Sequence, residues 1–82
     1  MRFRYHAEVL DALAGHGLAP GPDTPPALLR DALSDLYRYE IRAHRDSLLA
    51  GRVAKEHYID GVLALRRKYW LLSVPVDRWT QA

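Results

Sequence analysis

The chain has 82 residues, of which 49% are hydrophobic and 27% are charged, and its formal net charge is +2. These values predict one small soluble domain, at a size where a single core gives only modest stability and association is a natural supplement. The absence of cysteine excludes disulfides, thiolate metal sites and cysteine nucleophiles. No apolar run approaches the roughly 18 residues of a membrane span, and the first residues lack the apolar stretch of a secretion signal. We therefore expect a cytoplasmic protein.

Charge is unevenly distributed along the chain. Residues 1–35 carry three basic and five acidic side chains, a difference of −2, whereas residues 36–68 carry eight basic and four acidic ones, a difference of +4. Such polarity can steer an anionic partner, or it can pair two copies of the chain head to tail.

The first predicted element is a short helix over about residues 4–14. Apolar residues recur there at helical spacing, and Gly15 or Gly17 is expected to end the helix. The connector that follows, residues 18–23, contains two prolines and a glycine and cannot be helical.

The most informative stretch of the sequence runs from Thr24 to Gly51. A hydroxyl side chain at Thr24, proline at the first helical position and glycine just past the end predict one helix over about residues 25–50. Its length would be about 39 Å at 1.5 Å per residue, whereas a compact domain of this size is about 30 Å across. Either this helix projects as the arm of a hairpin, or a second copy of the chain covers the excess.

A third helix is predicted over about residues 54–72, where Pro75 and the residue before it prevent its continuation. The short break at residues 51–53 makes the two long helices antiparallel neighbours. Residues 73–82 have the spacing of an extended tail that lies back over the helices. The fold class is therefore all-α: one domain, with a long antiparallel helical hairpin, a short N-terminal helix packed across it and an extended C-terminal tail.

Glu40 lies near the centre of the apolar face of the long helix, and Arg66 lies within the apolar face of the third helix. A buried carboxylate needs a partner, because burying it unpaired costs several kcal/mol or shifts its pKa. Folding the hairpin about Arg52 brings the two residues within a turn of each other. We predict a buried ion pair between Glu40 and Arg66, joined by a tyrosine hydroxyl, whose role is to fix the register of the two helices.

Two pairs of histidine and acidic residues have a spacing that is compatible with metal binding on a helix. Glu40 and His44 are spaced i, i+4, and His57 and Asp60 are spaced i, i+3. The first pair falls on the inner face of its helix and the second on the outer face of the next, so no metal site is expected. No Gly-rich phosphate loop or serine elbow is present either, and we expect no cofactor, no catalytic residue and no enzymatic activity.

Several apolar residues lie off the main apolar faces of the predicted helices. A set of them along an overlong helix indicates a second packing surface, for which a symmetric dimer is the commonest use. We therefore expect a non-enzymatic protein that acts through protein–protein contact, as a homodimer or as a subunit of a larger assembly with another protein. The predicted partner-binding residues are Leu28, Tyr39, Leu49 and Leu71.

The alternative is a nucleic-acid-binding accessory protein. Arginine side chains interleaved with aromatic ones can bind phosphates and bases, although charged residues on the outer face of a helix commonly form its solvated side. The residues that would form this basic surface are Arg38, Arg42, Arg45, Arg52, Arg67 and Lys68.

Overall fold

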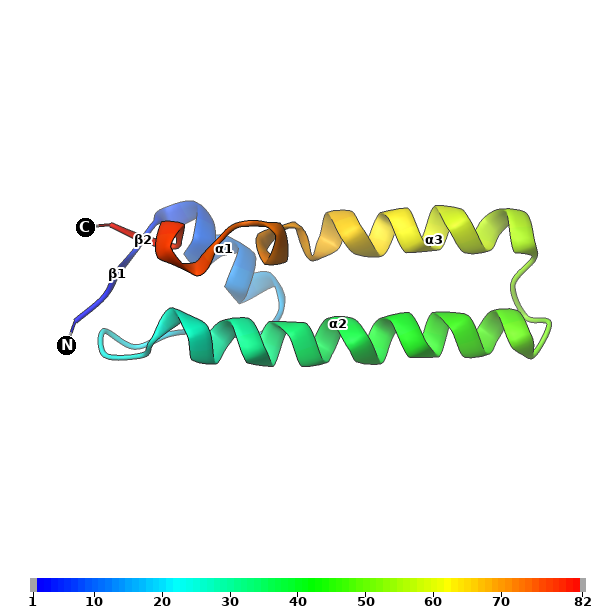
Figure 1. Ribbon diagram of the computed structural model, residues 1–82, viewed down its shortest axis with the longest axis horizontal. Helices are drawn as coiled ribbons and strands as arrows, with labels where there is room; N and C mark the ends of the chain where they lie inside the picture. Colours follow the sequence, from blue (N-terminus) through cyan, green and yellow to red (C-terminus); the bar gives the residue numbers. More distant parts are fainter. Residues whose placement is uncertain (1, 82) are drawn as a thin grey trace.

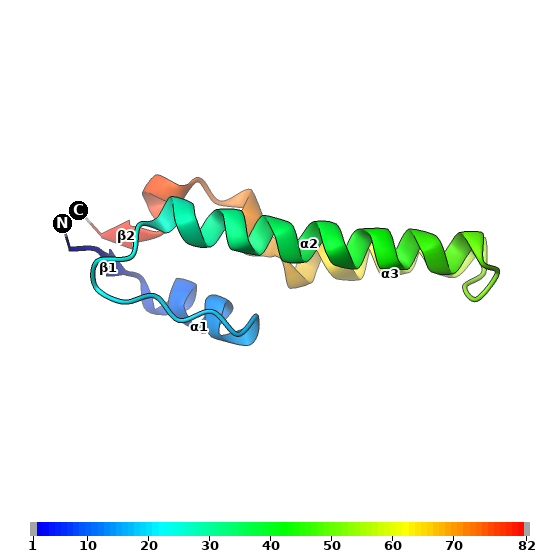
Figure 2. The same cartoon turned by 90° about the horizontal axis from the view of Figure 1, so that it is seen from below.

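The computed structural model describes residues 2–81 as an elongated, mostly helical molecule (Figure 1). Two long helices form an antiparallel hairpin, and the remaining elements gather at one end of it (Figures 1 and 2). The predicted all-α fold class is confirmed. In chain order the elements are β1 (Arg4–Tyr5), α1 (Ala7–Gly15), α2 (Pro26–Leu49), α3 (Lys55–Lys68), the 3₁₀ helices η1 (Trp70–Ser73) and η2 (Val76–Arg78), and β2 (Thr80–Gln81).

Helix α2 runs unbroken through all of its 24 residues, a length of about 36 Å. The molecule measures 49 × 17 × 15 Å, and its radius of gyration is 15.1 Å. A compact domain of this length has a radius of gyration of about 12 Å. The long helix therefore does extend beyond the globular part of the chain, as its sequence predicts.

The start of α2 differs from the sequence prediction. Pro25 is the residue before the helix and Pro26 is its first residue, but no side chain caps the helix. The hydroxyl of Thr24 instead accepts a hydrogen bond from the backbone N–H of Gly21 at 3.0 Å and so closes the preceding turn. The predicted end is confirmed, since Gly51 follows the helix with φ of 76°, a conformation that other residues rarely adopt.

Helix α3 ends at Lys68, four residues earlier than its predicted end. After Tyr69 the chain tightens into η1, which has about three residues per turn instead of 3.6. This change rotates the following side chains relative to a continuous α-helix, and it turns Leu71 into the interior, where only 1% of its surface is exposed. The prediction that Leu71 binds a partner is therefore wrong.

The two ends of the described chain are joined by a minimal antiparallel ladder. Arg4 pairs with Gln81 and Tyr5 with Thr80, and the Tyr5 hydroxyl donates to the carbonyl of Thr24 at 2.5 Å. The tail predicted as extended consists instead of two short 3₁₀ turns and this strand. Trp79 is fully buried beneath it, and its indole N–H donates to the carbonyl of Val74 at 3.0 Å.

The buried residues all lie at one end of the molecule. Helix α1, the first turns of α2 and the segment from Tyr69 to Trp79 supply them, and along the chain none of them lies between Leu33 and Tyr69. We call residues 38–68, which form the rest of the hairpin, the arm, and the other described residues the base. The buried side chains of the base are Val9, Leu13, Leu29, Leu33, Tyr69, Leu71 and Trp79.

Candidate functional site

The arm is two helices thick and presents two faces. Tyr37 and Tyr39 are two residues apart on α2, which places them about 200° apart around the helix axis, and each lines a different groove between α2 and α3. At the base, α1 covers one side of α2 and the C-terminal tail covers the other (Figure 2). Beyond α1 and the C-terminal tail, no element among residues 2–81 covers either face of the arm. We call these surfaces the Tyr39 face and the Tyr37 face.

The Tyr39 face is a shallow groove of about 480 Å³ with a floor of small side chains. Tyr39 stands at one end of it with 74% of its surface exposed. Ala43 and Ser47 on α2 and Ala64 on α3 leave little side-chain bulk between the backbone and an approaching partner. The groove is lined by Tyr39, Glu40, Ala43, His44, Ser47, Gly61, Ala64, Leu65 and Lys68.

His44 fixes the spacing of the two helices at the middle of the arm. Its imidazole stacks on the ring of Tyr58 with centroids 4.7 Å apart, and its Nε2 lies 2.8 Å from the carbonyl oxygen of Tyr58. Because a carbonyl oxygen only accepts, Nε2 carries the proton. The same imidazole lies over Gly61, where an added Cβ would come within 2.3 Å of it. This close approach explains a glycine in the middle of a helix.

Glu40 is bound at the boundary between the arm and the base, but not by Arg66. The Nζ of Lys68 donates to its two carboxylate oxygens at 3.0 and 3.1 Å, and the hydroxyl of Tyr69 donates to Oε2. Within residues 2–81, Arg66 forms no salt bridge. The predicted Glu40–Arg66 pair is therefore replaced by one with Lys68, two residues further on. The Glu40–Lys68 pair is also half-exposed, because each of the two helices covers only one side of the other.

This cluster perturbs the acidity of two side chains. The hydrogen bond from Tyr69 does most to lower the pKa of Glu40, helped by Lys68 and opposed by burial. Burial, reinforced by the neighbouring Glu40, raises the pKa of Tyr69 to about 12. A tyrosine that stays protonated and a carboxylate that stays ionised form a stable hydrogen bond over the whole physiological range. The cluster positions α3 against α2 rather than supplying a group that titrates near neutrality.

His16 adds a contact from the base that the sequence analysis does not identify. It follows α1, stacks on Tyr69 with ring centroids 4.4 Å apart, and its Nε2 lies 3.0 Å from the carbonyl oxygen of Lys68. It thus satisfies a carbonyl at the C-terminal end of α3. His16 and Lys68 are 52 positions apart in the sequence, so no local sequence pattern predicts this contact.

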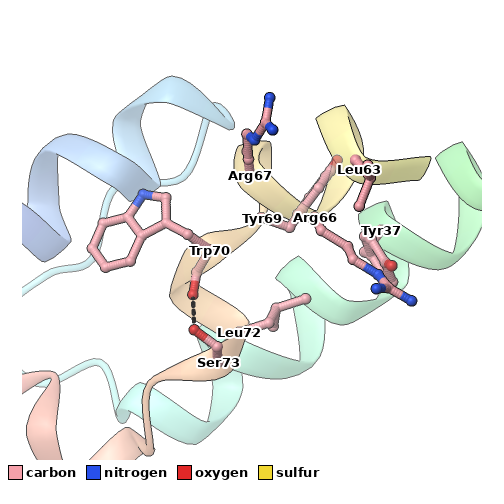
Figure 3. Close-up of a pocket in the computed structure, with 8 residues that line it drawn as sticks. All are labelled: Tyr37, Leu63, Arg66, Arg67, Tyr69, Trp70, Leu72 and Ser73. Carbon is pink, nitrogen blue, oxygen red and sulfur yellow. Dashed lines mark hydrogen bonds between the residues drawn. The ribbon is translucent and has the colours of Figure 1, made fainter. Parts of the chain in front are cut away.

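The Tyr37 face is larger and more apolar, with a groove of about 580 Å³. In Figure 3, Arg66 runs from α3 toward Tyr37, with Leu63 beside it, while Trp70 lies on the far side of Tyr69. One turn further along the arm, Ile59 continues the line of Leu63, and 61% and 42% of their respective surfaces are exposed. The lining residues are Tyr37, Leu63, Arg66, Arg67, Tyr69, Trp70, Leu72 and Ser73.

The predicted partner-binding residues do not form one surface. Leu28, Tyr39 and Leu49 are all strongly exposed, as expected. However, Leu28 lies at the base and Leu49 at the tip of the arm, 21 residues and about 32 Å apart along α2. Only Tyr39 belongs to a groove. Ile59 and Leu63, which belong to the apolar face of α3, are also exposed, because the hairpin does not cover that part of the face.

The six basic residues of the alternative interpretation are also spread over several surfaces. Lys68 lies on the Tyr39 face and binds Glu40, whereas Arg67 lines the Tyr37 face. Arg38, which pairs with Asp35 at 3.6 Å, and Arg45 lie on the side of α2 that borders the Tyr37 face, Arg42 is exposed on the outer side of α2, and Arg52 lies in the connection between the helices. Nucleic-acid binding by this set stays a prediction.

Across residues 2–81, no group of three or more histidine, aspartate or glutamate side chains is placed to hold a metal ion. The described helices also include none with the length and apolar character needed to cross a membrane. Comparison with known proteins finds no family model that matches the chain, no similar curated protein and no similar solved structure. The two uncovered faces of the arm are the surfaces of this molecule that are available for binding.

Proposed function

We propose that this chain is a non-enzymatic association protein whose arm is completed by a second copy of itself. One observation carries the proposal: of the 14 residues of α3, none is buried, and this includes Leu65, which lines the groove beside Tyr39. A helix gains most of its stability in a protein by packing an apolar face. An arm of two helices cannot provide that packing, and a second arm laid upon it can.

The Tyr39 face is the surface we propose for this contact. Tyr39 projects from the surface, and the groove of small residues begins one turn further along α2, at Ala43, and continues to Ser47. In an antiparallel two-fold dimer with its axis near Ala43, Tyr39 of each copy enters the groove of the other. Such a contact is self-complementary, as a two-fold interface requires. Aromatic side chains in pockets are also the commonest anchors of protein interfaces.

The position of α1 favours the antiparallel arrangement. Gly15, the last residue of α1, and His16, which follows it, lie beside Tyr39 at the base end of the Tyr39 face. In a parallel dimer the two α1 helices would meet on the same side and keep the arms apart. With the bases at opposite ends, the tip of each arm lies next to the partner's α1 instead. The result is a four-helix bundle with a base at each end.

Charge on the Tyr39 face is compatible with self-association. Glu40 and Asp46 lie on or beside it together with Lys68, so two copies of the face do not meet as surfaces of one sign. The chain contains no cysteine, which fits a reducing compartment such as the cytoplasm, and we propose that the dimer acts there.

The test compares the same substitution on the two faces of the arm. Tyr39→Glu places an unpaired carboxylate at the centre of the proposed interface, whereas Ile59→Glu places one on the opposite face, at a residue that is also mostly exposed. Both variants should keep the helical circular dichroism of the unchanged protein, since neither residue is buried. We expect light scattering to report a dimer for the unchanged protein and for Ile59→Glu, and a monomer for Tyr39→Glu.

Two results would count against this arrangement. If Ile59→Glu dissociates the dimer and Tyr39→Glu does not, the two copies meet through the Tyr37 face. If the unchanged protein is a monomer throughout the micromolar range, a second copy does not complete the arm. A different protein would then have to cover its exposed helices.

A further inference from the structure

We infer that the Tyr37 face binds an amphipathic helix with acidic flanks, contributed by another protein. The inference goes beyond the proposed dimer, because it concerns the face of the arm that the dimer leaves uncovered. Its apolar part consists of Ile59 and Leu63 on α3, continued by Tyr37 and Leu72 toward the base. This line of apolar side chains at helical spacing is the kind of groove that the apolar face of a partner helix occupies.

Charge identifies the partner's chemistry. Arg66 lines the groove on α3, and Arg45 lies one turn beyond Ile41 on the side of α2 that borders the same face. Lys55, one turn before Ile59, extends the series toward the tip. The charged residues that line the groove, Arg66 and Arg67, are both basic. Toward the tip, Glu56 lies seven residues before Leu63 on the same side of α3 and offsets Lys55, so the basic part of the face is the part nearer the base.

The same charge argument disfavours a second copy on this face. In an antiparallel pair of Tyr37 faces, the arginines of one arm would lie against those of the other, and juxtaposed like charges oppose association. An acidic helix reverses the sign of that interaction. Arg38 contributes less, because it already pairs with Asp35, so Arg45 and Arg66 carry most of the effect.

The spacing of these two arginines sets the pattern expected in the partner. His44 lies over Gly61, so Arg45 is level with Asp60, and Arg66 lies six residues, or about 9 Å, nearer the base along the arm. A partner helix that reaches both arginines needs acidic residues about two turns apart, on either side of a stripe of leucines. Between the levels of the two arginines the exposed apolar side chain of α3 is the aliphatic Leu63, which favours a helix over nucleic acid because a base needs an aromatic ring on which to stack. The aromatic residues of the groove, Tyr37 and Trp70, lie nearer the base.

The test uses a designed peptide and the protein's own fluorescence. The peptide is about 15 residues long, close to the length of α3, with leucines at positions i, i+4, i+7 and i+11, glutamates beside that stripe and no tryptophan. The control peptide has lysine in place of each glutamate. Trp70 lines the groove and is 41% exposed, whereas Trp79 is fully buried. A spectral shift on binding therefore reports on Trp70.

We expect the glutamate peptide to shift the emission to the blue in a saturable manner, and the lysine peptide to leave it unchanged. Ile59→Glu should weaken binding of the glutamate peptide about tenfold or more, equivalent to about 1.4 kcal/mol. Arg66→Glu should reverse the preference between the two peptides. Tyr39→Glu should bind the glutamate peptide as the unchanged protein does, even though we expect it to be a monomer.

Four outcomes would overturn the inference. Equal binding of both peptides would remove the role of charge, and binding unaffected by Ile59→Glu would place the peptide elsewhere. Absence of binding at peptide concentrations well above micromolar would show that the face does not accept such a helix. A shift caused by a short single-stranded DNA at low salt, but by neither peptide, would assign the face to nucleic acid. None of these outcomes bears on the dimer, which is measured by its mass.

Discussion

The base and the arm share helix α2 and yet are stabilised differently. In the base, α1 and the C-terminal tail enclose the first turns of α2, and side chains such as Leu33 and Trp79 lose all contact with solvent. In the arm, the same α2 meets only α3, and its contacts are specific ones: a histidine over a glycine and a carboxylate between a lysine and a tyrosine. The base therefore supplies the stability of the fold, whereas the arm supplies surface.

This difference shows what a two-helix layer can achieve. Polar contacts fix the register of α3 on α2, but the ion pair adds little stability because the side chains of Lys68 and Glu40 are 51% and 32% exposed. Burial of apolar area would add more, and it requires a third layer that the chain places only at the base. The exposed residues Ile59, Leu63 and Tyr39 mark where such a layer is missing.

The largest expected effect comes from comparing the loss of a leucine side chain in the base with the same loss in the arm. Leu33→Ala removes a fully buried side chain and should lower the free energy of unfolding by about 2–5 kcal/mol. Leu63→Ala, at a residue that is 42% exposed, should lower it by less than about 1 kcal/mol. Urea denaturation at one fixed protein concentration measures both. Similar losses would mean that the arm is as well packed as the base.

Gly61→Ala tests the close approach within the arm. The added Cβ would meet the His44 imidazole, and overpacking of this kind should cost about 1–3 kcal/mol, despite alanine's advantage of about 1 kcal/mol in a helix. In a His44→Ala background the clash disappears, and the same substitution should become neutral or stabilising. The unchanged protein, the two single variants and the double variant form a double-mutant cycle, which gives the coupling free energy between residues 44 and 61. Additive effects would show that His44 does not lie over Gly61.

Features that depend on local sequence could be predicted, whereas contacts between distant segments of the chain could not. Proline at the start, glycine at the end and a run without breakers are local signals, so the long helix and the hairpin could be predicted. The partner of Glu40 could not, since choosing Lys68 over Arg66 depends on where α3 ends and η1 begins. The stacking of His16 on Tyr69 and the two-residue ladder of β1 and β2 join distant segments and have no periodic pattern. The exposure of Ile59 and Leu63 could not be predicted either, because periodicity shows which face of a helix is apolar but not whether anything covers it.

The pH dependence of stability should report on Tyr69. Its pKa is raised to about 12 in the folded chain, so between about pH 10 and pH 12 the unfolded chain loses this proton while the folded chain retains it. Stability contributed by this group is therefore complete below about pH 10 and is lost as the pH rises toward 12. We expect Tyr69→Phe to flatten this part of the stability profile measured by urea denaturation. An unchanged slope would indicate that Tyr69 titrates as a free tyrosine.

The smallest expected effect concerns Glu40. Glu40→Gln removes the charge that binds Lys68 but preserves an acceptor for the Tyr69 hydroxyl, so the free energy of unfolding should fall by less than about 1 kcal/mol. Because the pKa of Glu40 is lowered in the folded chain, its contribution is present near neutral pH and is lost as the pH falls through that lowered value. Arg66→Gln is the matched control and should leave stability unchanged. A larger loss for Arg66→Gln than for Glu40→Gln would restore the pair expected from the sequence.

The most direct test of the account is the mass of the unmodified chain in solution. Sedimentation equilibrium across the micromolar concentration range should give a mass that approaches twice the 9.4 kDa of one chain, with dissociation on dilution. A mass of one chain at every concentration would contradict the claim that a second arm completes the first.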